Sequence, residues 1–214
     1  MFITIEGIDG SGKSTQADHL ANWLSAVSDE KVIRTFEPGG WNGGKTLRKF
    51  ILETKNLCTM SEFLLFMADR AEHLHRVIIP ELLAGNHVVC ERWNESTLAY
   101  QCGGHGMDYD FAEKVIASCS FPEPDVKIFL DIPPAIAFSR MKSRENLDDK
   151  HKRDRFEAEG LVFLEKVSSF YHRLIAKNPD KFIMIDCGER QEHEIAGEIM
   201  RKLGVELSDE PNSD

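Results

Sequence analysis

The sequence lacks several features that would assign it to other classes of protein. It has no run of about 18 apolar residues, which a membrane-spanning helix would need. Its first residues, MFITI, have neither a basic segment nor a long apolar stretch, so they do not resemble a signal peptide. The cysteines are five in number and form no Cys-x-x-Cys pair, which favours reduced, mostly buried thiols. We therefore expect a cytoplasmic protein.

An excess of positive charge is also missing. The chain has 26 Lys and Arg against 36 Asp and Glu, which gives a formal net charge of −10. Nucleic acids and anionic membranes attract clustered positive charge, so we expect neither as a main partner. Because 42% of its 214 residues are hydrophobic, the chain can form a sizeable core. It can still bind a small anion through one local basic pocket.

Short apolar runs alternate with helical patterns along the chain. The predicted strands are residues 2–5, 32–36, 87–90, 127–132 and 182–185, and the predicted helices include 17–27, 63–78, 111–119, 134–146, 156–177 and 190–203. This alternation is typical of an α/β fold, a parallel sheet flanked by helices on both faces. We expect about five parallel strands in one domain over residues 1–205. The acidic residues 206–214 are expected to form a disordered tail.

Residues 7–15, GIDGSGKST, follow the first predicted strand and open a helix. Their spacing is that of the phosphate-binding loop of nucleotide-binding proteins. Glycines let backbone N–H groups turn toward an anion, and the helix N-terminus adds partial positive charge. We expect this loop to bind the phosphates of ATP, with Lys13 on the β- and γ-phosphates and the Ser14 hydroxyl on Mg²⁺. The predicted nucleotide-binding residues are Gly7, Asp9, Gly10, Ser11, Gly12, Lys13, Ser14 and Thr15.

The acceptor of the phosphoryl group is harder to predict. The Asn/Thr-Lys-x-Asp string with which GTP-binding switches read guanine is absent. Arginines stand instead in three segments near strand ends, where a second anion can bind: 37–52, 64–73 and 91–106. These segments contain EPGG after the second strand, Phe66 and Arg70 four residues apart, and ERW after the third strand.

Together with Asp9 and the segment Ser96–Gln101, these motifs resemble those of thymidylate kinases over about residues 1–200. The resemblance implies a P-loop kinase fold and transfer of the γ-phosphoryl group of ATP to dTMP, with Mg²⁺. By analogy it also implies a homodimer. Two alternatives remain: another nucleotide or nucleoside kinase of the same fold, and a non-catalytic nucleotide-dependent switch.

Several residues acquire roles from chemistry and the resemblance together. A guanidinium at Arg92 can hold the acceptor phosphate bidentately, and the resemblance adds Arg48 to that phosphate and Glu37 as a residue that orders the site. On sequence alone, Phe66 is better explained as a core residue, whereas the resemblance stacks it on the pyrimidine. The other residues assigned to the substrate are Arg70 on the base O4, Thr97 and Gln101 on the base edge, and Tyr100 against the deoxyribose.

Catalysis in such an enzyme needs alignment and charge neutralisation more than a general base, because the acceptor is already an ionised phosphate. The predicted catalytic residues are Asp9, Lys13, Arg92 and Arg153. A carboxylate at Asp9 is reasonable only if Mg²⁺, a water bound to it or an arginine lies close. Gly10 stands where one subclass of thymidylate kinases has an arginine. We therefore expect a basic residue of a lid over about 142–155, foremost Arg153, to supply the missing charge.

The sequence also departs from the family pattern. Glu91, predicted with Ser14 as a metal-binding residue, stands where the family has Asp, and Trp93 replaces a Tyr. These changes bear on the strictness of substrate choice, not on the class of reaction. His105 lies in a glycine-rich segment near the predicted site and receives no role.

Overall fold

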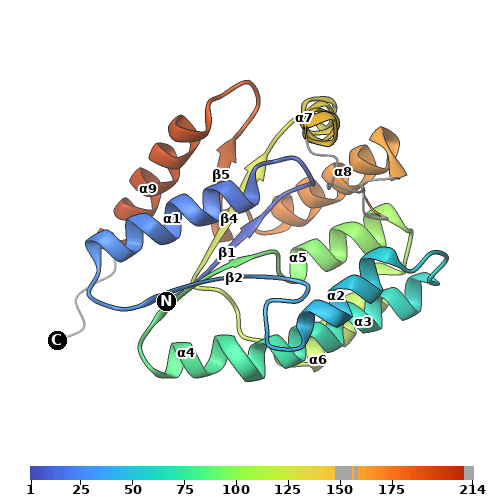
Figure 1. Cartoon of the computed structure of the whole chain (residues 1–214), viewed down its shortest axis with the longest axis horizontal. Helices are drawn as coiled ribbons and strands as arrows, with labels where there is room; N and C mark the ends of the chain where they lie inside the picture. Colours follow the sequence, from blue (N-terminus) through green and yellow to red (C-terminus); the bar gives the residue numbers. More distant parts are fainter. Residues whose placement is uncertain (148–155, 157–158, 210–214) are drawn as a thin grey trace.

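The fold is a five-stranded parallel sheet between two layers of helices, as the sequence predicts. The structure, a computed structural model, describes residues 1–147, 156 and 159–209. The strands are β1 (Phe2–Glu6), β2 (Val32–Phe36), β3 (His87–Glu91), β4 (Val126–Asp131) and β5 (Phe182–Asp186). They are hydrogen-bonded in the order β2-β3-β1-β4-β5, which places β1 at the centre (Figure 1).

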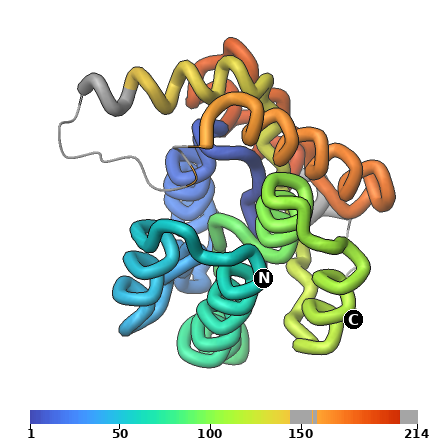
Figure 2. The backbone as a smooth tube through the Cα atoms, turned by 90° about the vertical axis from the view of Figure 1, so that its right-hand side faces the viewer, coloured from blue at the N-terminus to red at the C-terminus, as the bar shows by residue number. Residues whose placement is uncertain are grey.

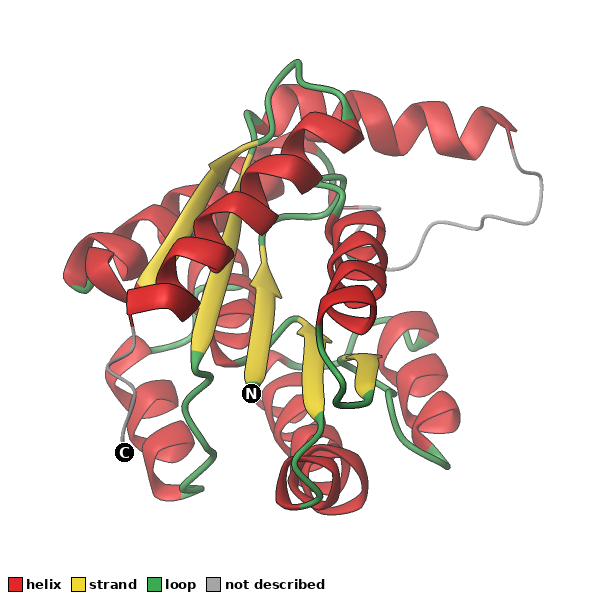
Figure 3. Cartoon of the chain, turned by 90° about the vertical axis from the view of Figure 1, so that its left-hand side faces the viewer, coloured by secondary structure: helices red, strands yellow, loops and turns green. Residues whose placement is uncertain are grey.

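Helices cover both faces of this sheet (Figure 3). On one face, α1 (Lys13–Val27) lies beside α9 (Glu192–Asp209). The other face is covered by α8 (Leu161–Lys177), the short α5 (Asn94–Thr97) and the π-helical η2 (Leu98–Gly104). The remaining helices are α2 (Gly44–Glu53), α3 (Thr59–His73), η1 (Leu74–Ile78), α4 (Ile79–Leu83), α6 (Tyr109–Ser118), α7 (Pro134–Leu147) and the short 3-10 turn η4 (Pro179–Lys181). Figure 2 shows α7 reaching outward from the rest of the molecule.

The main core lies between the central strands and these two helix layers. Every residue of β1 is buried, because the strand is covered on both faces. Ile3 and Ile5 pack there with Leu20 and Leu24 of α1 and with Tyr171 of α8. A buried strand of this kind fixes the position of whatever follows its carboxyl end.

Some predicted boundaries differ from the structure. The helix predicted over 156–177 begins at Leu161, because Gly160 has a φ of 87° and cannot continue a right-handed helix. Helix α9 continues to Asp209, so residues 206–209 of the predicted disordered tail are helical, and 210–214 lie outside the described residues. Helix α2 was not predicted at all. Pro80 stands near the start of α4, as expected of a proline in a helical pattern.

In the described part of the chain, every helix is too short or too polar to cross a lipid bilayer. The five cysteines are all free thiols, three of them buried and two exposed, Cys58 and Cys119.

Candidate active site

The carboxyl ends of β1, β2 and β3 open into one cavity of about 670 Å³. In parallel α/β sheets this edge is where ligands bind. The cavity is lined by fifteen of the predicted site residues: Asp9, Gly10, Gly12, Lys13, Ser14, Thr15, Glu37, Arg48, Phe66, Arg70, Glu91, Arg92, Thr97, Tyr100 and Gln101. Gly7 and Ser11 belong to the same loop but do not line it, and Arg153 lies outside the described residues.

The phosphate-binding loop connects β1 to α1. Gly12 has a φ of 94° and no side chain caps the first turn of α1, so the N–H groups there have no side-chain acceptor. Gly10 has a φ of 81°, and a Cβ on it would lie 2.4 Å from the Ala137 carbonyl oxygen of α7. These features leave backbone donors at the cavity, which is the arrangement that binds an anion at a helix N-terminus.

Lys13 is the buried cation of this loop. Its Nζ donates to the Ile8 carbonyl at 2.8 Å and lies 3.9 Å from Asp9 Oδ1. Burial, together with the positive charge of Arg92, lowers the pKa of Lys13 to about 8. A phosphate beside Nζ would reverse this shift, because an opposite charge favours the ammonium form.

Arg92 and Asp9 form an ion pair between the turn after β3 and the phosphate-binding loop. Of the three partners considered for Asp9, namely Mg²⁺, a water bound to it and an arginine, the structure shows an arginine, Arg92. Tyr100 Oη also donates to Asp9 Oδ2 at 2.8 Å. Burial would raise the pKa of Asp9, but Arg92, Lys13 and the Tyr100 hydroxyl outweigh it and hold the pKa below its usual value. Asp9 is thus an ionised group that orients Arg92.

The Arg92 backbone has a φ of 71°, in the left-handed region that non-glycine residues avoid. A buried carboxylate holds this turn. Glu6 Oε1 accepts from the backbone N–H of Trp93 at 2.7 Å and that of Ser96 at 3.3 Å, and its Oε2 accepts from Tyr171 Oη at 2.8 Å. These bonds fix the backbone that aims Arg92 into the cavity. Sequence analysis gave Glu6 no role, since it reads as the end of a strand.

Ser14 and Glu91 lie close enough to share one cation. Ser14 Oγ donates to Glu91 Oε2 at 2.9 Å, and Arg34 Nη2 donates to the same oxygen at 3.1 Å. Burial would raise the pKa of Glu91, but Lys13, Arg92, Ser14 and Arg34 outweigh it, so the pKa is lowered. An ionised carboxylate beside a hydroxyl fits the oxygen ligands that Mg²⁺ prefers.

Glu37 and Arg70 form a buried pair at the other end of the cavity. Arg70 Nε donates to Glu37 Oε2 at 2.7 Å, and its Nη1 and Nη2 donate to Asn94 Oδ1 at 2.9 Å and to Thr97 Oγ1 at 3.0 Å. The guanidinium also lies 5.0 Å from the centre of the Trp93 ring. In this structure Arg70 therefore joins α3 to the segments after β2 and β3. Its expected contact with a base oxygen stays a prediction.

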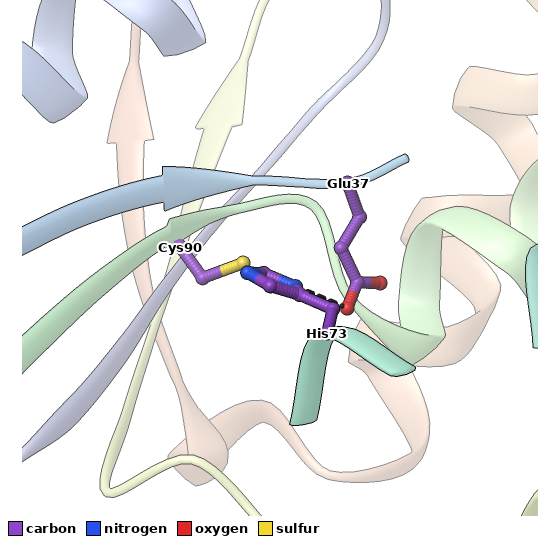
Figure 4. Close-up of side chains that lie close together, drawn as sticks. All are labelled: Glu37, His73 and Cys90. Atoms are coloured by element: carbon purple, nitrogen blue, oxygen red, sulfur yellow. Dashed lines mark hydrogen bonds and ion pairs between the residues drawn. The ribbon is translucent and has the colours of Figure 1, made fainter. Parts of the chain in front are cut away.

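His73 holds the other side of the Glu37 carboxylate (Figure 4). Its Nδ1 lies 3.0 Å from Glu37 Oε1 and its Nε2 lies 2.6 Å from Thr35 Oγ1. Cys90 is near enough to make a three-residue group of metal-ligand type with these two. However, both His73 nitrogens already have partners, and burial raises the pKa of the Cys90 thiol well above its usual value. The group is thus better explained as a support for Glu37 than as a metal centre.

The end of the cavity beyond Arg70 contains the residues expected to contact a base. Gln101 Nε2 donates to Glu62 Oε1 at 2.7 Å, and Thr97 accepts the bond from Arg70. Phe66 is half-buried and its ring centre lies 6.0 Å from that of Phe156, which also lines the cavity. Phe66 is therefore both packed against the core and exposed to the cavity, so the two interpretations from sequence are compatible.

Arg48 projects from α2 toward the same cavity. Its Nη1 donates to the Pro38 carbonyl at 2.8 Å, and its guanidinium lies 5.3 Å from the centre of the Phe36 ring. The cis peptide bond between Glu37 and Pro38 lies in this turn. Arg48 and Arg92 thus approach the cavity from different elements.

Sequence analysis missed six residues that line the cavity: Arg34, Phe36, Pro38, Leu52, Ser96 and Phe156. A signal existed for Arg34, which interrupts the apolar strand β2 two residues before its end. It existed also for Pro38 and Ser96, which stand within motifs that were recognised. Phe156 follows the predicted lid, and nothing in its immediate sequence relates it to the cavity.

Comparison with known proteins agrees with this geometry. The family model described as thymidylate kinase matches residues 5–199. The thymidylate kinase of Solidesulfovibrio magneticus is 42% identical over 191 residues, which is 87% of this chain and 91% of that protein. That of Desulfovibrio desulfuricans is 39% identical over 196 residues, 90% of each chain.

A solved structure gives the same result for the fold. The crystal structure of thymidylate kinase from Ehrlichia chaffeensis superposes with a TM-score of 0.76 at 28% sequence identity, covering 95% of this chain and 98% of that one. Both the matching family model and the relatives extend over most of the chain. The chain therefore belongs to the thymidylate kinase family of nucleoside monophosphate kinases.

Proposed function

We propose that this protein transfers the γ-phosphoryl group of ATP to dTMP, giving ADP and dTDP. The observation that carries the proposal is one cavity lined both by the phosphate-binding loop, at Lys13 and Ser14, and by a second set of cations, at Arg48 and Arg92. Two anionic substrates can therefore meet in it. Its remaining walls contain the aromatic and amide side chains that suit a pyrimidine, Phe66 and Gln101.

The donor end is built for the phosphates of ATP. The N–H groups at the start of α1 and the Lys13 ammonium would bind the β- and γ-phosphates. Ser14 and Glu91 would hold Mg²⁺, Glu91 either directly or through a water molecule. When bound, Mg²⁺ neutralises charge that spreads over the phosphate oxygens in the transition state.

The acceptor end positions the attacking phosphate. Arg92 would exchange part of its pairing with Asp9 for the dTMP phosphate, and Arg48 would approach it from α2. Because a phosphate dianion is already a competent nucleophile, these cations need only align it with the γ-phosphoryl group. A basic residue of the segment 142–155, foremost Arg153, would supply further charge to the transferring group.

An ADP-release assay with Mg-ATP and a panel of monophosphates tests this function. We expect dTMP to be the best acceptor. We expect dUMP to be weaker, because one missing methyl group in an apolar pocket costs about 1–3 kcal/mol of transition-state binding. If dCMP, AMP or GMP is a better acceptor than dTMP, the substrate assignment is wrong. If no monophosphate is phosphorylated, a nucleotide-dependent switch becomes the better hypothesis.

We further propose that two copies of the chain associate. Exposed apolar side chains occur on α2, α3 and α6, which lie in the same region of the molecule (Figure 1): Phe50, Met60, Leu64 and Phe111. Light scattering should give twice the chain mass of 24.3 kDa. Leu64→Glu should lower it to one chain mass, whereas Leu83→Glu, at an exposed leucine of α4, should not. A wild-type monomer would contradict the proposal.

A further inference from the structure

Glu62 is a fully buried carboxylate on α3, next to the end of the cavity expected to contact a base. Its Oε1 accepts two hydrogen bonds, from Gln101 Nε2 at 2.7 Å and from His105 Nδ1 at 2.9 Å. Burial of a carboxylate is unfavourable unless donors satisfy it, so both contacts stabilise Glu62 in this place. Neither Glu62 nor His105 received a role from the sequence.

The contact with Glu62 decides which way the Gln101 amide points. The amide NH₂ faces Glu62, because Gln101 Nε2 donates to the carboxyl oxygen Oε1. The carbonyl oxygen Oε1 is then turned away from Glu62. Gln101 lines the cavity, is 1% exposed, and its Oε1 is buried with no hydrogen-bond partner among the described residues. Buried polar atoms are rarely left unpaired, so the missing partner of this oxygen is evidence for a donor on the ligand.

We propose that Glu62 is a positioning residue that determines base specificity by holding the Gln101 amide in this orientation. The inference rests on the proposed function and deepens it. Because Glu62 holds the NH₂ group, the oxygen is the atom of the Gln101 amide that is left to accept from a base edge with an N–H donor. Thymine and uracil carry such a donor at N3, whereas N3 of cytosine is itself an acceptor. Glu62 thus selects 4-oxo-pyrimidines through Gln101 without touching them.

His105 connects the same carboxylate to the cavity wall. Its ring stacks on Phe156, with ring centres 5.8 Å apart and an angle of 18° between the planes. Phe156 lines the cavity and also lies against Tyr100. Glu62 therefore holds two neighbouring side chains in place, Gln101 and His105, and of these two it is Gln101 that lines the cavity.

The test is to remove the acceptor at position 62 and measure base preference. Glu62→Leu keeps much of the volume but cannot accept, whereas Glu62→Gln keeps an oxygen in the same place and is the matched control. The readout is kcat/KM for dTMP and for dCMP with Mg-ATP. Where dCMP turnover is undetectable, its inhibition constant against dTMP replaces it. Glu62→Leu should lower the preference for dTMP about tenfold, equivalent to about 1.4 kcal/mol, and Glu62→Gln should stay near wild type.

A second substitution separates this role from a structural one. In a Gln101→Leu background the preference should already be lowered, and adding Glu62→Leu should change it no further. If Glu62→Leu does not fold, Glu62→Met replaces it, because methionine adapts to irregular buried space. A folded Leu or Met variant with wild-type preference, or with equal losses for dTMP and dCMP, would overturn the inference. Failure of the proposed function would show differently, as a wild-type protein that does not prefer dTMP.

Discussion

Arg70 Nε donates to Glu37 Oε2 across 2.7 Å, and both side chains are almost completely buried, at 1% and 3% exposure. The pair joins α3 to the turn after β2. The other two guanidinium nitrogens are committed to Asn94 and Thr97. Arg70 is therefore a structural junction in addition to any contact it makes with a substrate.

This pairing predicts a large stability effect at position 70. Arg70→Met should lower the free energy of unfolding by about 3–5 kcal/mol, because Glu37 is left as a buried and poorly compensated charge. The double variant Arg70→Met/Glu37→Gln should recover part of that loss, since no unpaired charge remains. Urea unfolding measures both. A single variant as stable as the parent would show that the pair is not needed to hold the turn.

Two substitutions of Arg92 separate the effect of its guanidinium on activity from the effect of its backbone conformation on stability. Arg92→Ala and Arg92→Gly should both lower kcat/KM by about 10²-fold or more, equally for dTMP and dUMP, because both acceptors carry the phosphate. The glycine variant should be more stable than the alanine variant by about 1 kcal/mol, since only glycine accepts a φ of 71° without strain. Assays and thermal denaturation on the pair decide this. Unequal loss between the two acceptors would assign Arg92 to the base instead.

The lowered pKa of Lys13 predicts that the free energy of unfolding of the nucleotide-free protein depends on pH. Its pKa is about 8 in the fold against an ordinary value of about 10.5, so between these pH values the unfolded chain holds the extra proton. The contribution of Lys13 to stability should therefore increase as the pH rises across this window. It should be least favourable below pH 8. Lys13→Met should make the nucleotide-free protein more stable at pH 7, by at most about 3 kcal/mol.

Comparison of the parent with Lys13→Met separates the effect of Lys13 on stability from the effects of other groups that titrate in the same pH range. The stability advantage of Lys13→Met should shrink as the pH approaches 10, and Mg-ATP should stabilise the parent but not the variant. Lys45→Met, at an exposed lysine of α2, is the matched control and should show no such difference. If Lys13→Met is less stable than the parent at pH 7, the hydrogen bond to Ile8 outweighs the burial of the charge.

The proposed roles of Ser14 and Glu91 as Mg²⁺ ligands predict how the reaction rate of their variants depends on Mg²⁺. Glu91→Gln and Ser14→Ala should each raise the Mg²⁺ concentration for half-maximal rate, by about 10- to 100-fold if metal contacts here resemble those of other sites. Ser25→Ala, on the same helix but bonded to the Ala21 carbonyl, is the control and should not change it. Titration of the rate with Mg²⁺ at fixed ATP gives the answer. An unchanged requirement in both site variants would remove these residues as ligands.

The parts of the molecule predicted well from sequence are those specified locally. Strand order along the chain, the loop before Lys13 and the helical spacing of Thr97 and Gln101 depend on residues a few positions apart. The start of α8 was missed by five residues because helical periodicity gave more weight to the apolar pattern than to Gly160. That glycine was the available signal.

The unpredicted parts of the site depend on pairs far apart in the chain. Glu6 is 165 residues from Tyr171, and Glu62 is 43 residues from His105. No spacing rule relates such residues, because the folding of the sheet brings them together. A lone acidic residue in a strand or helix has no distinguishing pattern, so the sequence does not predict a role for Glu6 or Glu62.

The contact between Gly10 and α7 limits how this chain can change. A Cβ at position 10 would lie 2.4 Å from the Ala137 carbonyl oxygen and 2.9 Å from its carbonyl carbon, both of them backbone atoms that no rotamer can move aside. An arginine in the loop is therefore not one substitution away. It needs a concurrent change that shifts the first turns of α7, the helix that leads from β4 toward residues 148–155. A side chain at position 10 and the present course of the α7 backbone therefore exclude each other, because both need the same space.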